Sequence, residues 1–297
     1  MEKVIVLTGP TGIGKTNLSL KLASSFDLEI INADASQFKK DLNIGTGKYD
    51  TFNTNIKHHL FDIIDADSNY SIKDFQDSAR VLISDINLNN KVPMVVGGTG
   101  LYINSLLYNY NLDDEGRCEE TSNKYNDLNN HELHELLNKL DPLAALNIHE
   151  NNRRRVLRAI EKCENGKCVR NNDDTLIYDA LIIVLDCDRE LLYKRINSRV
   201  EAMFSDGWVD EVRSLKEKYD IKKIKDIGYY EISLYLDGEL DLASCKELIK
   251  KKTRNYAKRQ LTWFRNKLKE AKVVNVDFDD LDKTYDVLSN LVKEFIN

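Results

Sequence analysis

The chain has 297 residues, which is enough for one large α/β domain or for a core with a smaller inserted domain. Hydrophobic residues make up 42% and charged residues 31%, so we expect a folded, soluble protein. The chain contains no run of about 18 apolar residues, and its first apolar run is too short for a secretory signal. These features exclude membrane-spanning and secreted classes, and we expect a cytoplasmic protein.

The cysteine spacing also favours a cytoplasmic protein. The sequence contains no C-x-x-C pair and no histidines at zinc-finger spacing. We therefore interpret the five cysteines as reduced thiols: Cys118, Cys163, Cys168, Cys187 and Cys245.

A glycine-rich loop follows the first predicted strand, Val4–Leu7, and precedes a helix predicted from Lys15 to Ser25. The loop fits G-x-x-x-x-G-K-[ST] at every fixed position, and this pattern between a strand and a helix is typical of phosphate binding. Its N–H groups and the helix N-terminus would face phosphate oxygens. The loop reads Gly9-Pro10-Thr11-Gly12-Ile13-Gly14-Lys15-Thr16.

Strands and helices then alternate along the chain. A strand is predicted over Leu28–Ala33, ending at Asp34, and the apolar periodicity of Ser71–Asn87 predicts a helix. A second buried strand, Val92–Val96, runs into the turn Gly97-Gly98-Thr99-Gly100 and a further helix. This alternation indicates a parallel sheet with crossover helices, an α/β fold.

The pattern changes after residue 111. Residues 112–176 contain polar helical segments and no convincing strand, so we interpret them as a small helical insertion. The strand Ala180–Leu185 resumes the α/β pattern, and helices are predicted to the end of the chain. The predicted core therefore comprises residues 1–111 and 177–297.

Basic residues gather in two places although the net charge is −6. The segment Lys246–Lys269 carries ten Lys or Arg and one acid, and Arg153–Arg155 with Arg158 forms a second cluster. On a helix, Lys251, Arg254, Lys258 and Arg265 would share one side. Such a basic stripe is typical of a surface that binds nucleic-acid phosphates.

The loop does not by itself identify the phosphate compound. A kinase or NTPase would use a Mg²⁺-coordinating Asp after a buried strand, and Asp34 could fill that place. The glycine turn at Gly97–Thr99 has no role in that scheme.

The motifs taken in order resemble the tRNA dimethylallyltransferase family (tRNA isopentenyltransferases) over nearly the whole chain. Several motifs in the same order are far more specific than the phosphate loop alone. Besides that loop, they are Asn32–Gln37, Asn43–Lys48, His58–Leu60, Tyr70-Ser71 with Asp74-Phe75, Gly97–Tyr102, Asn152 with Arg154-Arg155 and Arg158-Ala159, Arg195-Ile196 with Arg199 and Met203, Ile227–Tyr229, and Thr253–Arg265.

The resemblance implies a phosphate-loop NTPase-like sheet and transfer of a dimethylallyl group from dimethylallyl diphosphate. The acceptor would be the exocyclic amine of the adenine 3′ of the tRNA anticodon. Mg²⁺ on the Thr16 hydroxyl would be the cofactor, the anticodon stem-loop of tRNA the macromolecular partner, and a monomer the expected state.

The resemblance also assigns roles to residues. Asp34 would accept the amine proton, Thr99 would orient the reacting groups, and Lys15 with Arg199 and Arg195 would offset charge on the leaving diphosphate. Residues carried over as tRNA contacts are Asp34, Ala35, Ser36, Gln37, Arg154, Arg155, Arg158, Gly228, Tyr229, Lys258, Gln260 and Arg265.

The chain departs from the family pattern at three positions. The family usually has Ser where Ala35 stands, and often an aromatic residue and a glycine in place of Lys39 and Asp41. Two alternatives remain from the sequence. A relative that prenylates free adenine nucleotides would need neither the insertion nor the basic helix, and a phosphate-loop kinase or NTPase would need no prenyl donor.

Overall fold

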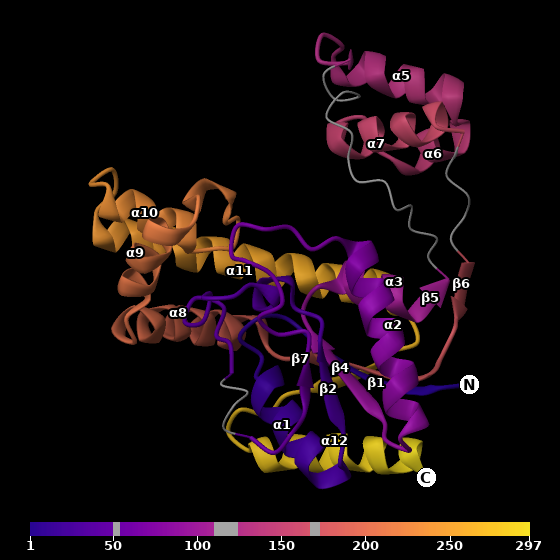
Figure 1. Cartoon of the computed structure of the whole chain (residues 1–297), viewed down its shortest axis with the longest axis vertical. Coiled ribbons are helices and arrows are strands. Elements are labelled where there is room, and N and C mark those ends of the chain that lie inside the picture. Colours follow the sequence, from indigo (N-terminus) through magenta and orange to yellow (C-terminus); the bar gives the residue numbers. More distant parts are fainter. Residues whose placement is uncertain (50–53, 110–123, 167–172) are drawn as a thin grey trace. The chain divides into compact units, whose positions relative to one another are not determined.

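A computed structural model describes residues 1–49, 54–109, 124–166 and 173–297 of the chain. These residues form two compact units, residues 1–109 with 175–297 and residues 110–174. Figure 1 labels helices and strands of both units.

The first unit is built on a six-stranded sheet with the order β3-β2-β4-β1-β7-β8, in which every neighbouring pair is parallel. The α/β fold predicted from the sequence is confirmed. All four predicted strands form, because each consists mainly of apolar residues that a sheet covered on both faces can bury. The strands are β1 (Lys3–Thr8), β2 (Glu29–Asn32), β3 (His58–His59), β4 (Pro93–Gly97), β7 (Asp179–Asp186) and β8 (Lys272–Asn275).

Helices cover both faces of this sheet. Ile5 and Leu7 of β1 join a buried cluster with residues of α1, α8 and α12, while α2 and α3 pack on β2 and β4. The alternation of side chains along each strand divides the core between these two faces. The helices are α1 (Lys15–Phe26), α2 (Ile72–Leu88), α3 (Gly100–Leu107), α8 (Arg189–Ser205), α9 (Trp208–Lys218), α10 (Tyr229–Leu236), α11 (Leu242–Lys267) and α12 (Leu281–Ile296).

The long helix α11 passes over the carboxyl edge of the sheet (Figure 1). The loops that follow β1, β2, β4 and β7 meet at that edge, because parallel strands all end on the same side. Ligands of open parallel sheets bind at this edge, where neighbouring crossovers leave in opposite directions. Here β1 lies between β4 and β7, and the phosphate loop follows β1.

In the described part of the second unit, three helices surround a small apolar core that includes Leu133, Leu137, Val156 and Ile160. A capping box at Asn129 and Glu132 begins the first of them, and Arg153 donates hydrogen bonds to the carbonyls of Leu128 and Tyr125. The helices are α5 (Asn130–Leu140), α6 (Pro142–Asn147) and α7 (Arg153–Glu164).

Several short strands were not predicted. β8 is an edge strand in which only Val274 is buried, so it lacks the apolar run that marks a central strand. The prediction of no strand in residues 112–176 was wrong, because β6 (Asp173–Leu176) pairs with β5 (Tyr108–Asn109). The mostly polar sequence of β6 shows no alternation of apolar and polar residues. Pairing with β5 therefore decides that these residues form a strand.

Cys163, Cys187 and Cys245 are free thiols, and Cys118 and Cys168 lie outside the described residues. Within the described residues, no helix is long and apolar enough to cross a membrane.

Candidate active site at the carboxyl edge of the sheet

The phosphate loop runs from β1 into α1, as its sequence predicts. Gly12 and Gly14 adopt positive φ angles of 82° and 101°, a conformation that residues with a Cβ rarely take. Gly14 is the N-cap of α1 and has no side chain that could accept a hydrogen bond from the first N–H groups of the helix, so these groups remain available to a ligand. This is the arrangement that binds phosphate oxygens at helix N-termini.

Lys15 lies inside this loop. Its ammonium donates to the carbonyls of Gly9 at 2.8 Å and Pro10 at 3.0 Å. Burial lowers the pKa of Lys15 to about 8, and the nearby Asp34 carboxylate opposes that change. The ammonium is therefore held where a second anion would stabilise its charge.

Two arginines of α8 face the loop from the other side. Arg195 donates to the carbonyl of Gly12 at 3.3 Å, and its guanidinium lies 3.9 Å from the centre of the Phe278 ring. Arg199 donates to the carbonyl of Thr46 at 3.5 Å. Burial lowers the pKa of Arg199, and Asp34 opposes this change.

These groups surround a polar cavity of about 390 Å³. It is lined by Thr11, Gly12, Gly14, Lys15, Thr16, Asn17, Asp34, Gln37, Thr46, Gly47, Lys48, Tyr49, Arg195 and Arg199. The sequence predicted Lys15, Thr16, Asp34, Arg195 and Arg199 as site residues, and the fold brings all five to this one cavity.

Asp34 is the N-cap of the short 3₁₀ helix Ala35–Phe38, and its carboxylate accepts a hydrogen bond from Ser36 N at 3.1 Å. Burial raises the pKa of Asp34, and this effect outweighs the opposing charge of Lys15 and the hydrogen bond from Ser36. A carboxylate with a raised pKa is a stronger proton acceptor. The capping role and the chemical role are thus compatible in one residue.

Thr99 lies beside Asp34 in space. Its hydroxyl accepts from Ala35 N at 3.2 Å, and its own N–H donates to the Ala33 carbonyl at 3.3 Å. Tyr256 of α11 reaches the same place, where burial raises its pKa, the Asp34 carboxylate adds to that rise, and a hydrogen bond with Thr99 opposes it. Thr99 therefore connects the loop after β2 with α11.

The turn after β4 requires glycine because other segments of the chain approach its backbone closely. A Cβ on Gly97 would overlap the backbone of Ala33, and a Cβ on Gly100 would overlap the Trp263 ring. Gln260 also contacts this turn: it is 5% exposed, accepts from Thr11 N at 2.9 Å and donates to the Gly98 carbonyl at 2.8 Å. Gln260 thereby fastens the phosphate loop to the turn.

The structure gives a reason for two departures from the family pattern. Lys39 donates to Asp226 at 2.8 Å, and Ser36 donates to the other oxygen of the same carboxylate at 2.6 Å. The Lys39 and Asp226 side chains are 14% and 13% exposed, so each stabilises the charge of the other. Asp41 has a left-handed φ of 64°, the conformation for which glycine is the usual choice.

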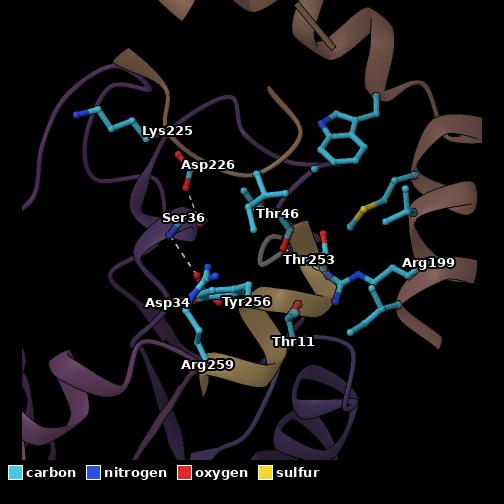
Figure 2. A pocket seen from close by; sticks show the side chains of 16 residues that line it. Thr11, Asp34, Ser36, Thr46, Arg199, Lys225, Asp226, Thr253, Tyr256 and Arg259 are labelled. Carbon is cyan, nitrogen blue, oxygen red and sulfur yellow. Dashed lines mark hydrogen bonds between the residues drawn. The ribbon is translucent and has the colours of Figure 1, made fainter. Parts of the chain in front are cut away.

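A second cavity, of about 320 Å³, adjoins the first and shares Thr11, Asp34, Thr46 and Arg199 with it. Figure 2 shows Asp34, Ser36 and Asp226 on one side of this cavity and Arg199 on the opposite side. Its remaining lining is partly apolar and partly basic: Ile196, Val200, Met203, Trp208, Ile227, Lys225, Tyr256 and Arg259, with Gly45 and Thr253. Asp34 thus stands where a polar and a mixed cavity meet.

The residues carried over as tRNA contacts fall into different environments. Arg154 and Arg155 are exposed on α7, whereas Arg158 pairs with Glu161 at 2.7 Å. Lys258 is exposed on α11, and Arg265 donates to Asp186 at 2.9 Å.

Tyr229 differs from its predicted role, because its side chain is fully buried and its hydroxyl donates to Glu211 at 2.8 Å. A buried side chain has no surface for RNA, so the Tyr229 side chain is a core residue. Gln260 is likewise engaged inside the protein. Gly228 begins α10 with a φ of 101° and packs against Trp208.

Sequence reasoning placed residues 225–232 among the expected tRNA contacts but gave no role in the reaction to two polar residues that line the second cavity, Asp226 and Tyr256. Asp226 follows a lysine in a loop and shows no pattern of its own. Tyr256 lies outside the basic stripe of its helix, and periodicity separates the faces of a helix without showing which face meets a cavity.

Among the described residues, no cluster of three His, Cys, Asp or Glu side chains could hold a metal ion. The Thr16 hydroxyl lines this cavity and is an oxygen that could ligate a metal ion bound together with a phosphate group. Mg²⁺ is commonly bound in this way, with few protein ligands and several waters.

A family model described as IPP transferase matches residues 37–267. The chain belongs to the IPP transferase family. A tRNA dimethylallyltransferase of Anoxybacillus flavithermus is 44% identical over 276 residues, covering 90% of this chain and 88% of the relative. That of Bacillus subtilis is 42% identical and covers 90% of this chain and 89% of the relative.

Solved structures of IPP transferase family members are also similar. A tRNA isopentenylpyrophosphate transferase of Staphylococcus epidermidis superposes with a TM-score of 0.73 at 36% identity, covering 99% of both chains. A eukaryotic dimethylallyltransferase acting on tRNA gives a TM-score of 0.85 at 28% identity, covering all of this chain and 80% of that one. The family resemblance and the phosphate-loop fold expected from the sequence are confirmed.

We predict that Gln260→Ala lowers the free energy of unfolding by about 2–4 kcal/mol, because the amide of Thr11 and the carbonyl of Gly98 both lose a buried partner. Urea denaturation measures this change. Asn266→Ala on the exposed side of the same helix is the matched control and should stay within about 0.5 kcal/mol of wild type. Equal stability of the two variants would contradict the bridging role of Gln260.

Proposed function

We propose that this chain transfers a dimethylallyl group from dimethylallyl diphosphate to the exocyclic amine of the adenine 3′ of the anticodon in tRNA. The observation that carries the proposal is the junction of the two cavities at Asp34. One cavity offers cations and a helix N-terminus to a diphosphate, and the other offers apolar and polar walls to a prenyl group and a base. The relatives named as tRNA dimethylallyltransferases support the same reaction.

The donor diphosphate would bind the phosphate loop. The N–H groups at the start of α1 would face its oxygens, and Lys15, Arg195 and Arg199 would balance its charge. The Thr16 hydroxyl, in the first turn of α1, would hold Mg²⁺ together with those oxygens. The bound ion would supply further positive charge to the leaving diphosphate.

In the transfer, the adenine nitrogen forms a bond to the allylic carbon while the bond between that carbon and the diphosphate oxygen breaks. Diphosphate leaves with the bonding electrons, and Lys15 and Arg199 stabilise the charge that grows on it. The amine loses a proton, which Asp34 accepts. The raised pKa of Asp34 favours this step because a carboxylate that binds protons more tightly is a better general base.

The acceptor base must leave the anticodon loop to reach Asp34. Extrusion is least costly from a loop, where no base pair is broken. Lys225 and Arg259 line the mixed cavity and would meet the RNA backbone, and the exposed Lys251 and Lys258 of α11 extend the basic surface. Exposed Arg154 and Arg155 would contact the anticodon stem. We propose that the chain acts in the cytoplasm as a monomer.

One assay tests the proposal directly. The protein is incubated with labelled dimethylallyl diphosphate and Mg²⁺, with either bulk tRNA or AMP as the acceptor. We expect label in tRNA and none in AMP. Label in AMP alone would assign the activity to free nucleotides, and nucleotide hydrolysis without label transfer would assign a kinase or NTPase.

Lys15→Ala should weaken donor binding or slow donor turnover while tRNA binding persists. Because the pKa of Lys15 is about 8, its charge is lost as the pH rises through that value, and a bound diphosphate should restore it. Calorimetry at pH 8.5 in buffers of different ionisation enthalpy should show uptake of up to about one proton per donor in wild type. The variant should show none. Equal loss of tRNA affinity in filter binding would contradict this assignment.

Lys251→Ala with Lys258→Ala should weaken tRNA binding. Both side chains are exposed on one side of α11, so each can release counterions from a phosphate. The slope of log affinity against log salt should fall by about one for each lost contact. Lys283→Ala with Lys293→Ala is the charge-matched control, since both lysines are exposed on α12. An unchanged slope in the α11 variant would show that its lysines are only solvated.

Asp34→Asn should lower kcat by about 10²–10⁴-fold, because Asn keeps the size of the side chain but cannot accept a proton. Equilibrium tRNA binding should change by less than about tenfold. The pKa of Asp34 is raised, so the wild-type rate should fall with decreasing pH at a value above the ordinary 3.8 of an Asp, and this limb should be absent in the variant.

Single-turnover prenylation on protein shown to be folded by circular dichroism measures these effects. Normal turnover by Asp34→Asn would mean that the proton leaves to water. Loss of tRNA binding together with a lower kcat would show that Asp34 serves mainly to recognise tRNA.

A further inference from the structure

The mixed cavity has one apolar side. Ile196, Val200 and Met203 lie on successive turns of α8 and line this side, and Trp208 lines it from the start of α9. The same helix α8 also carries Arg195 and Arg199, which line the adjoining polar cavity proposed to bind the diphosphate. A ligand with a diphosphate head and a hydrocarbon tail therefore finds a matching surface along a single helix.

The indole ring of Trp208 is fixed in place. It is 1% exposed and lies between Gly45 and Gly228, where a Cβ on either glycine would overlap the ring. Phe204 and Tyr229 contact it edge-on, with ring centres 5.6 and 5.8 Å away. The ring is thus surrounded on the sides that do not face the cavity.

The loop that carries Gly45 is also held firmly. The Glu211 carboxylate accepts from three consecutive N–H groups, those of Asn43 at 3.0 Å, Ile44 at 2.7 Å and Gly45 at 3.2 Å. Glu211 lies one turn after Trp208 in α9, so one short helix supplies both the ring and the group that fixes the loop against it. The ring cannot turn away without breaking these contacts.

We infer that Trp208 closes the prenyl-binding end of the cavity and restricts the donor to a single five-carbon isoprene unit. The inference rests on the proposed function and specifies its donor class. Much of the cavity's volume of about 320 Å³ must hold the acceptor base. A fixed wall excludes a longer tail by steric overlap, since a packed interior accommodates added carbons only by straining its neighbours.

The test compares dimethylallyl diphosphate with its ten-carbon homologue, geranyl diphosphate. Each donor loses diphosphate as the adenine nitrogen bonds to its allylic carbon, and the amine proton leaves in the same way. The readout is the ratio of kcat/KM for the two donors with tRNA as acceptor. Wild type should strongly prefer the five-carbon donor.

Trp208→Leu should lower this preference by at least about tenfold, because the shorter side chain opens the end of the cavity. Met203→Ala widens the same end from α8 and should lower the preference in the same direction. If Trp208→Leu does not fold, the donor ratio of Met203→Ala tests the inference in its place. Tyr193→Leu is the matched control: it shortens an aromatic side chain of α8 that contacts Arg189 and lines neither cavity, and it should leave the ratio unchanged.

Two results would overturn the inference. One is equal use of both donors by wild type, and the other is an unchanged ratio in folded, active Trp208→Leu or Met203→Ala. An unchanged ratio with a raised KM for tRNA would assign Trp208 to the acceptor instead. Failure of the proposed function is distinguishable, because wild type would then transfer neither prenyl group.

Discussion

Two cations and one carboxylate share a poorly solvated space at the carboxyl edge of the sheet, and the site depends on their mutual stabilisation. Burial disfavours the charge of Lys15, Arg199 and Asp34 alike, while the attraction of Asp34 to each cation opposes that effect. The net result is a lysine whose pKa is lowered, an aspartate whose pKa is raised and an arginine that stays charged. Such a set favours binding of an added anion and acceptance of a proton in the same place.

The surrounding structure holds these charges in position. Gln260 joins the phosphate loop to the turn after β4, and the glycines of that turn allow α11 and the loop after β2 to come close. Glu211 fixes the loop whose Thr46 carbonyl accepts a hydrogen bond from Arg199. Buried polar groups that are fully paired in this way give a rigid site, which supports pre-organised electrostatic stabilisation.

The departures at Lys39 and Asp41 show how one chain varies a shared site. Lys39 places a charge in a wall that is mostly enclosed, and Asp226 compensates it while also holding the Ser36 hydroxyl. Asp41 keeps the left-handed backbone that glycine would adopt, and its carboxylate accepts from the Tyr219 hydroxyl at 3.1 Å. Both changes therefore keep the segment after β2 in place without the usual residues.

The sequence alone determined the central strands and the phosphate-loop pattern, and it singled out Lys15, Thr16 and Asp34, which line one cavity in the fold. Continuous apolar runs and a glycine pattern between a strand and a helix are local signals, so they can be read without the fold. The tertiary structure decided which further residues join Asp34 in the second cavity: Asp226 and Tyr256 come from two separate segments. It also revealed β6 and β8 and the burial of Tyr229 and Gln260, because short strands and helix faces are specified mainly by what packs against them.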